Sequence, residues 1–251
     1  MEPSKISWIY WGFLALLTRA VAFALCIAGL FFLPQAAAAL DVPPGAAHFD
    51  RISRSDGLSN ASVSSIVQDR QGFIWFGTQG GLNRYDGRDV RVFEHDPFDS
   101  QSLPHNLIQT MYLDPTMDCI WIGTYRGLSR FDIFTEEFTN YRHAEDRPDT
   151  LSDDVVTAII RGRSETLWIG TLDGLNRLDT TTESISRVDG LPHQTVRSLH
   201  FDSAGRLWVG TYGGLAELDP GTGEVLRIVT AAEGLASNYV MDIHETDRRS
   251  E

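Results

Sequence analysis

The chain has 251 residues, of which 42% are hydrophobic and 22% are charged. These proportions are typical of a globular protein and exclude wholesale disorder. The formal net charge of −13 predicts an acidic surface that repels phosphate backbones, which counts against nucleic acids as partners.

Residues 1–39 have the pattern of an export segment. Lys5 and Arg19 precede an apolar run at Ala20–Leu33, and Pro34 and several alanines follow it. A positive start, an apolar stretch and small residues are the parts of a signal peptide. We expect a cleaved signal peptide or an uncleaved signal anchor here, with a buried helix of the fold as the other alternative, and a linker at 40–47. The remainder would then be exported and periplasmic.

One motif occurs four times in the rest of the chain. Its copies read IWFGTQGGLNRYD, IWIGTYRGLSRFD, LWIGTLDGLNRLD and LWVGTYGGLAELD, and they begin at Ile74, Ile120, Leu167 and Leu207. The tryptophans of successive copies lie 46, 47 and 40 residues apart. A period of this length is typical of a solenoid, an array or a propeller.

The content of one unit selects among these folds. The third unit contains the segments VVTAIIRG, TLWIGT, LNRLD and SISRVD, separated by short polar turns. Four antiparallel strands in each such period form the blade of a β-propeller. Neighbouring positions of the second segment are both apolar, as expected for a sheet covered on both faces. The sequence therefore predicts an all-β β-propeller with four complete four-stranded blades.

The repeated motif carries two glycines with different expected roles. The first follows the tryptophan, where a missing side chain lets the neighbouring blade approach closely. The second lies where a hairpin turn needs a positive φ. The structural repeat positions are Trp75, Gly77, Trp121, Gly123, Trp168, Gly170, Trp208 and Gly210, and the turn glycines are Gly81, Gly127, Gly174 and Gly214.

Partial units flank the four complete ones. Residues 48–60 align with the end of a unit, while residues 234–251 align with the start of a unit and contain no tryptophan. We expect residues 48–251 to form an open arc of a larger ring, with partial blades at both ends, as a fragment or a truncated gene product. A closed four-bladed ring is the alternative. An open arc would expose sheet faces and associate.

These repeats resemble the two-component regulator propeller family. The first copy, NASVSSIVQDRQGFIWFGTQGGLNRYD, follows the family pattern N-x-V-x-x-I-x-x-D-x-x-G-x-[IL]-W-[IFV]-G-T-x-x-G-L, and the resemblance covers about residues 48–245. It implies seven-bladed rings in exported sensor domains of hybrid histidine kinases or diguanylate cyclases. Such proteins continue into a transmembrane helix and a cytoplasmic effector, and a homodimer of the complete parent is one arrangement that the resemblance allows.

Connectors between antiparallel strands alternate between the two ends of a sheet. The connectors that enter each blade should therefore share one face with the turns between its second and third strands. The tips on this face vary while the framework repeats, which suits recognition of an extracytoplasmic ligand such as an oligosaccharide or a peptide; solvated turns are the alternative. The ligand-face candidates are Gln79, Tyr125, Arg126, Asp173, Tyr212, His105, Asn106, His193 and Gln194.

The sequence carries no recognisable catalytic motif, since HExxH, G-x-S-x-G, CxxC and a phosphate loop are all missing. We therefore predict no catalytic residue, no metal site and no cofactor. His105 and His193 are interpreted as turn residues, and the acidic loop at 145–154 as a solvated loop rather than a calcium site. Cys119 is expected to be an inert buried thiol. The aspartates that end each third strand are interpreted as turn formers: Asp86, Asp132, Asp179 and Asp219.

Three functions follow from these features as hypotheses. The first is the ligand-sensing input domain of a membrane signal-transduction protein, inactive as an enzyme, with its effector module outside this chain. The second is an exported propeller enzyme, such as a lyase or a glycosidase. It would need acid and base groups near the central channel, where the inner strands offer little beyond Tyr112, Arg161 and His200. The third is a passive protein-interaction scaffold.

Overall fold

The computed structural model describes residues 51–246. The predicted export segment, the linker and the first three residues of the predicted propeller lie outside this range. The described residues belong to one compact unit that begins at Arg51. Within them, no helix combines the length and the apolar character that a membrane crossing requires.

The described part folds into four sheets of four strands each. In every sheet the strands follow chain order and pair antiparallel with their neighbours. The first sheet contains β1 (Val63–Gln68), β2 (Ile74–Thr78), β3 (Gly81–Tyr85) and β4 (Val90–Phe93). The second contains β5 (Ile108–Asp114), β6 (Cys119–Thr124), β7 (Gly127–Asp132) and β8 (Phe138–Tyr141). The third contains β9 (Val156–Arg161), β10 (Thr166–Thr171), β11 (Gly174–Asp179) and β12 (Ile185–Val188). The fourth contains β13 (Val196–Phe201), β14 (Leu207–Thr211), β15 (Gly214–Leu218) and β16 (Val225–Val229).

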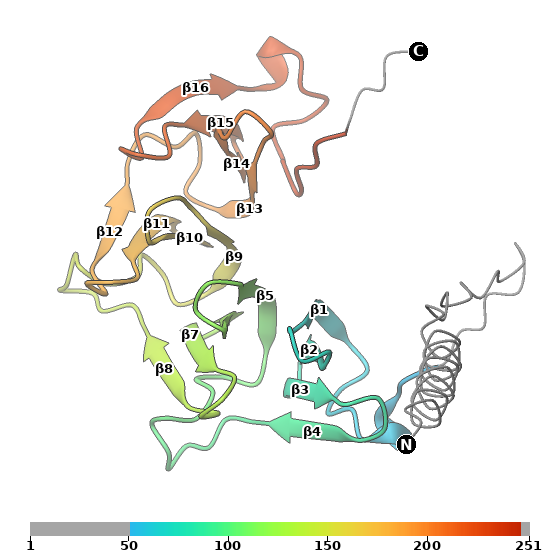
Figure 1. Ribbon diagram of the computed structural model, residues 1–251. Helices are drawn as coiled ribbons and strands as arrows, with labels where there is room; N and C mark the ends of the chain where they lie inside the picture. Colours follow the sequence, from blue (N-terminus) through green and yellow to red (C-terminus); the bar gives the residue numbers. More distant parts are fainter. Residues whose placement is uncertain (1–50, 247–251) are drawn as a thin grey trace, which may run out of the picture. The chain divides into compact units, whose positions relative to one another are not determined.

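Within this unit the sheets follow one another along an open arc (Figure 1). The first strands lie on its inner side, where β1 contacts β5, β5 contacts β9 and β9 contacts β13. The fourth strands lie on its outer side. The predicted all-β propeller with four complete blades in an open arrangement is therefore confirmed.

The glycine after each framework tryptophan is a point of close approach between sheets. A Cβ atom on Gly77 would lie 2.7 Å from Cγ2 of Ile108, and one on Gly123 would lie 2.7 Å from Cγ1 of Val156. Gly170 has the same relationship with Val196, at 2.5 Å. In each case the neighbour belongs to the first strand of the next sheet, so a side chain at the glycine would force the sheets apart.

The turn glycines have the conformation that the hairpin requires. Their φ values lie between 116° and 137°, a region that residues with a Cβ rarely adopt. Each begins the third strand of its sheet: Gly81, Gly127, Gly174 and Gly214.

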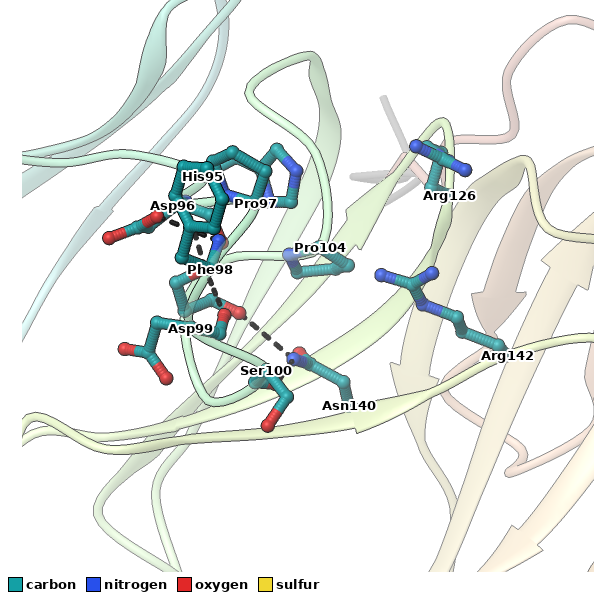
Figure 2. A pocket seen from close by; sticks show the side chains of 11 residues that line it. His95, Asp96, Pro97, Phe98, Asp99, Ser100, Pro104, Arg126, Asn140 and Arg142 are labelled. Atoms are coloured by element: carbon teal, nitrogen blue, oxygen red, sulfur yellow. Dashed lines mark hydrogen bonds between the residues drawn. The ribbon is translucent and has the colours of Figure 1, made fainter.

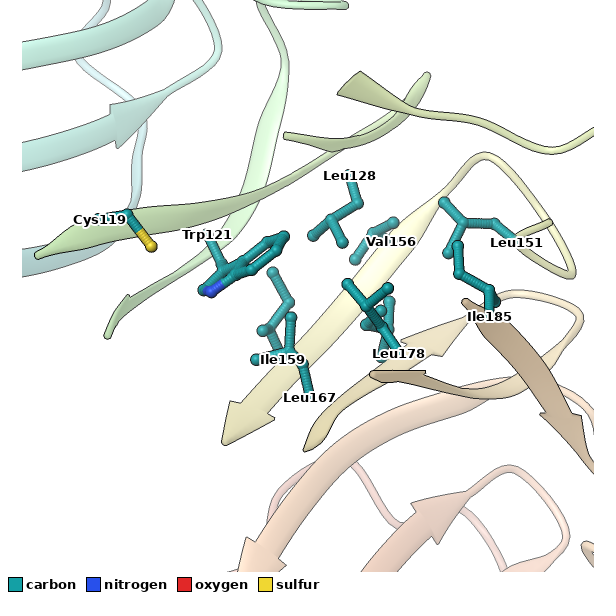
Figure 3. Close-up of a cluster of buried hydrophobic side chains, with 10 residues drawn as sticks. Cys119, Trp121, Leu128, Leu151, Val156, Ile159, Leu167, Leu178 and Ile185 are labelled. Atoms are coloured by element: carbon teal, nitrogen blue, oxygen red, sulfur yellow. The ribbon is translucent and has the colours of Figure 1, made fainter. Parts of the chain in front are cut away.

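The core lies between successive sheets. Trp75, Trp121 and Trp168 are completely buried, whereas Trp208 of the fourth sheet is half-buried. Figure 3 shows the cluster around Trp121, in which side chains of the second sheet meet those of the third. Burial of a tryptophan side chain contributes several kcal/mol, on the order of 25 cal/mol per Å².

One apolar position on the first strand is exposed in the first sheet and buried in the second and third sheets. Ile66, Met111 and Ile159 occupy equivalent places on the first strands of three sheets. Met111 and Ile159 are 7% and 9% exposed, while Ile66 is 60% exposed. The difference arises because β5 and β9 each pack against the preceding sheet, and the described residues hold no sheet before β1.

No strand forms in the described residues on either side of the four sheets. Residues 51–53 and 235–246 have no strand assignment, so the predicted inner strand of a further blade is absent there. Val240 nevertheless takes the equivalent place, because its N–H donates to the carbonyl of Thr211 at 2.9 Å. A Cβ on Gly210 would lie 2.8 Å from its Cγ1. A ladder needs a partner strand, and the described residues contain no second strand of that unit.

Candidate functional site

The connector that enters each sheet and the turn between its second and third strands, here called the second turn, lie at the same edge of the sheet, as the topology predicts. The N–H of Tyr125 donates to the carbonyl of Leu107 at 3.3 Å, which joins the turn between β6 and β7 to the connector that enters β5. Tyr212 makes the same bond with Thr195 at 3.3 Å. The N–H of Gly127 in turn donates to Asp154, in the connector of the next sheet, at 2.7 Å. Each second turn can thus contact its own connector and the following one.

The connector histidines hold their own turns. Nδ1 of His105 accepts the N–H of Leu107 at 3.0 Å, and Nδ1 of His193 accepts the N–H of Thr195 at 2.9 Å. The bond requires an unprotonated Nδ1. Burial, followed by the charges of Arg126 and His95, lowers the pKa of His105 below its usual range. Each of these rings thus holds the backbone of its own turn.

Each of these two histidines forms an aromatic pair with a tyrosine of the adjacent turn. The rings of His105 and Tyr125 have centroids 6.4 Å apart, and those of His193 and Tyr212 are 6.0 Å apart. Tyr239 adds an edge-on contact to Tyr212 at 5.3 Å. The side chain of Tyr125 is 43% exposed and that of Tyr239 is 65% exposed, so both present apolar rings to a ligand on this edge.

A cleft of about 550 Å³ lies where the connector between the first two sheets meets the second sheet. Figure 2 shows His95, Pro97 and Phe98 on one side of it and the guanidinium groups of Arg126 and Arg142 on the other. The cleft is lined by His95, Asp96, Pro97, Phe98, Asp99, Ser100, Ser102, Pro104, Arg126, Asn140 and Arg142. Its size is that of a small-molecule site, which spans about 300–1,000 Å³.

Hydrogen bonds fix the connector wall of this cleft. Asn140, on β8, donates from Nδ2 to the carbonyls of Ser100 and Ser102 at 3.1 and 2.9 Å. The N–H of His95 donates to Oδ1 of Asn106 at 2.6 Å, which closes the base of the connector. Asn106 is therefore occupied in holding the loop, and the wall is positioned before any ligand arrives.

The sheet register brings the two arginines together. Leu128 pairs with Tyr141 across β7 and β8, so Arg142 follows the last paired residue and Arg126 precedes the turn glycine opposite it. A Cβ on Gly127 would lie 3.2 Å from Cγ of Arg142. Both arginines are exposed. Among the described residues neither guanidinium has a hydrogen-bond or ion-pair partner.

The remaining candidates lie apart from this cleft. Gln79 is on the first sheet, Asp173 on the third, and Gln194 in the connector to the fourth, and all three are exposed turn residues. Phe98, Arg142 and Tyr239 join the edge without having been predicted. Arg142 could have been found by comparing the residue after each fourth strand, where the other repeats carry Glu94, Asp189 and Thr230.

Acidic residues in the described range serve turns and ion pairs. Asp149 pairs with Arg147 at 2.7 Å, and Asp154 accepts the N–H of His143 at 2.8 Å. Within residues 51–246 no group of three or more His, Cys, Asp or Glu side chains could hold a metal ion. The four repeated aspartates each accept two backbone N–H groups of the turn that follows: Asp86, Asp132, Asp179 and Asp219.

The comparisons with known proteins agree with this architecture. Residues 57–80 and 190–213 match the two component regulator propeller family. In these two segments the chain is similar to the repeats of that family. Each match runs from a connector through the first and second strands of the first or the fourth sheet. The second and third sheets have the same strand order.

A solved structure that contains similar propeller repeats is the extracellular domain of the hybrid two component system BT3049 from B. thetaiotaomicron. It is 32% identical, with a TM-score of 0.65, over 72% of this chain and 26% of that one. A stretch of 55 residues, 22% of this chain, is 42% identical to histidine kinase P4 of Formosa agariphila and covers 4% of that protein. The chain thus spans about a quarter or less of these two relatives.

More distant structures share the fold alone. PorZ of Porphyromonas gingivalis is 18% identical, with a TM-score of 0.57, over 79% of this chain and 32% of that one. Virginiamycin B lyase of Staphylococcus aureus is 16% identical, with a TM-score of 0.52, over 68% of this chain and 57% of that one. The four sheets therefore share the propeller fold with these two structures.

Proposed function

We propose that this chain is the exported, ligand-sensing input part of a membrane signal-transduction protein. The observation that carries the proposal is its 32% identity, over 72% of its length, to the extracellular domain of a hybrid two component system. The short match to a histidine kinase supports the same parent class. In this proposal the chain lies outside the cytoplasm, the membrane attachment and the effector belong to the complete protein, and the chain itself has no catalytic activity.

The geometry supports a binding role on the connector edge. The framework of tryptophans, turn glycines and aspartates repeats in every sheet, so it makes the scaffold and leaves the tips to differ. On that edge, exposed aromatic rings and unpaired guanidinium groups occur beside a preformed cleft. Variable tips on a rigid scaffold favour recognition of a small extracytoplasmic ligand, such as a saccharide or a peptide.

The test is a signalling measurement in cells that express the complete gene product. Replacement of Tyr125 and Tyr212 by alanine removes the tyrosine of each His–Tyr pair from the connector edge. We expect this double variant to lose its transcriptional or phosphorylation response to the growth substrate that stimulates the wild type.

Matched controls lie at the opposite ends of the strands. Gln71→Ala and Thr181→Ala change exposed residues in turns of the first and third sheets, and we expect them to keep the response. An unchanged response in the double tyrosine variant, with equal amounts of folded protein in the membrane, would contradict the proposal. Release of product from a polysaccharide by the purified chain would favour the enzyme alternative instead.

A further inference from the structure

The second sheet departs from the other three at two neighbouring positions. Arg126 stands before the turn glycine and Arg142 follows the fourth strand. The equivalent pairs in the first, third and fourth sheets are Gly80 with Glu94, Asp173 with Asp189, and Gly213 with Thr230. The fold therefore requires no basic side chain at either place, and the third sheet even carries two acids there.

The pair faces space rather than protein. Both side chains are exposed and line the cleft opposite Phe98, and neither has a partner among residues 51–246. Neither guanidinium is engaged by a protein group, so the donors of both are available to an anion in the cleft. The chain as a whole has a net charge of −13 and repels anions. The positive charge of Arg126 and Arg142 is therefore a local feature of this cleft.

The acids of the same cleft are already engaged. Oδ1 of Asp96 accepts the N–H of Phe98 at 2.9 Å, and Oδ1 of Asp99 accepts the N–H of Gln101 at 2.9 Å. Figure 2 shows both carboxylates on the side of the connector that lies away from the arginines. The part of the cleft between Arg126, Arg142 and Pro104 is thus positively charged.

The opposite wall offers an apolar platform. Phe98 is 97% exposed, which is unusual for a phenylalanine in a loop whose backbone is fixed by several hydrogen bonds. An aromatic ring of this kind packs against the flat face of a sugar or of another ring. The cleft therefore combines a ring-binding surface with two donors that match a carboxylate in a bidentate way.

We infer that this cleft binds a small ring compound carrying a carboxylate, of which a uronic acid saccharide is the form that also fits its volume and polar rim. The inference rests on the proposed sensing function and deepens it, because it assigns a ligand class to the connector edge. The carboxylate lies against Arg126 and Arg142, and the ring lies against Phe98 and Pro97.

The test is calorimetric titration of the purified chain with digalacturonate. Its dimethyl ester has the same rings without the charges, and 3-phenylpropionate carries a carboxylate on a two-carbon chain attached to an aromatic ring. We expect digalacturonate to bind at least about tenfold more tightly than the ester, with an affinity that falls as salt is added. Binding of 3-phenylpropionate alone would assign the site to aromatic acids instead of sugars, and would overturn the uronic acid assignment.

Variants separate this cleft from nonspecific binding. We expect Arg126→Gln and Arg142→Gln each to weaken digalacturonate binding about tenfold or more while leaving the ester unchanged. Phe98→Ala should weaken both compounds. Arg88→Gln removes an exposed arginine from the turn between β3 and β4 and should change neither. All four side chains are exposed, so circular dichroism should show unaltered folding.

Two results would overturn the inference. One is equal binding of digalacturonate and its ester, or binding that survives both arginine substitutions. The other is the absence of binding by either carboxylate at millimolar concentration. In both cases a cellular response that still depends on Tyr125 and Tyr212 would leave the input-domain proposal standing, whereas loss of that dependence would contradict the proposal independently.

Discussion

The backbone N–H of Ser152 donates to Oδ1 of Asn176 across 2.9 Å, which ties the connector that enters the third sheet to its third strand. Nδ2 of Asn176 donates in return to Oγ of Ser152 at 2.9 Å, and that hydroxyl lies 2.8 Å from Oγ1 of Thr171. Ser59 and Asn83 form the same N–H to Oδ1 bond in the first sheet, at 2.8 Å. This pair of bonds, here called the connector clasp, holds the candidate ligand edge in place.

Removal of the clasp should destabilise the protein. Asn176 is completely buried and Ser152 is 4% exposed, so Asn176→Ala leaves a buried N–H without an acceptor. We expect the free energy of unfolding to fall by about 1–3 kcal/mol. Urea unfolding measures the change, and Thr181→Ala, at an exposed turn position, is the control with an expected change within about 0.5 kcal/mol. A loss as small as the control's would show that the clasp contributes no net stability.

The second and fourth sheets replace the clasp with proline. Pro104 and Pro192 stand where Ser59 and Ser152 stand, and a proline has no N–H to donate. The facing strand position holds no asparagine in these two sheets: it is Ser129 in the second and Ala216 in the fourth. Asparagine thus occurs on the third strand only in the two sheets whose connector has a serine N–H to donate to it.

This pairing can be transplanted. In the fourth sheet we expect Pro192→Ser alone to leave an unpaired N–H and Ala216→Asn alone to bury an unpaired amide. The two changes together should be more stable than the sum of the single effects, by about 1 kcal/mol or more. A double-mutant cycle by chemical unfolding gives the coupling energy directly. Simple additivity would mean that the two positions do not meet as their equivalents do.

The framework could be predicted from the sequence because its physical causes repeat. The period placed all four sheets, and the glycine after each tryptophan predicted where the sheets approach. The cleft could not be predicted in the same way. Arg126 and Arg142 are 16 residues apart in the sequence, and only the register of β7 and β8 makes them neighbours. Phe98 lies in an irregular connector, where no period indicates the direction of a side chain.

The repeated tryptophans also differ in the hydrogen bonds of their indole N–H groups. Nε1 of Trp75 donates to Oδ2 of Asp69 at 2.8 Å, and Trp208 makes the same bond with Asp202 at 2.9 Å. The third sheet has Gly162 in place of the aspartate. The indole N–H of Trp168 is buried without a partner among the described residues. Identical tryptophans thus have different polar environments, which the strand motif alone does not reveal.

The contact at Gly123 should tolerate no side chain. A Cβ there would lie 2.7 Å from Cγ1 of Val156 and 2.8 Å from Cγ2 of Thr110. We expect Gly123→Ala to lower the free energy of unfolding by about 1–3 kcal/mol through overpacking. Val156→Ala frees part of this space, so the double variant should lose less than the sum of the two single variants. Thermal unfolding checks both values, and a neutral Gly123→Ala would mean that the sheets are not closely packed here.

Cys119 should be unreactive in the folded protein. It is 2% exposed, and burial, followed by the charge of Asp114, raises the pKa of its thiol to about 12. The thiolate that reacts with disulfide reagents is therefore scarce at neutral pH. We expect no modification by a disulfide reagent in buffer and full modification in denaturant, measured in a Cys26→Ser background so that one thiol is counted. Rapid modification of the native protein would contradict the buried position.

Acid should weaken the fourth sheet through Asp202. Its carboxylate accepts the indole N–H of Trp208, and the N–H and Nε of Arg206 at 2.9 and 2.6 Å. Burial alone would raise the pKa of Asp202, but these bonds outweigh it and lower the pKa to about 2. The unfolded chain has a pKa near about 3.9 at this residue. The stability that the ionised form contributes is thus present above about pH 4 and is lost as the pH falls toward about 2.

Replacement of this carboxylate isolates its share of the pH dependence. Asp202→Asn keeps an acceptor for Trp208 but cannot ionise, so we expect it to be less stable than the wild type at pH 7. The gap should narrow as the pH falls through the interval from about 4 to about 2, because protonation removes the charge from the wild type as well. Urea unfolding at several pH values measures this convergence. Parallel stability curves would show that the bonds to Trp208 and Arg206 do not favour the ionised carboxylate.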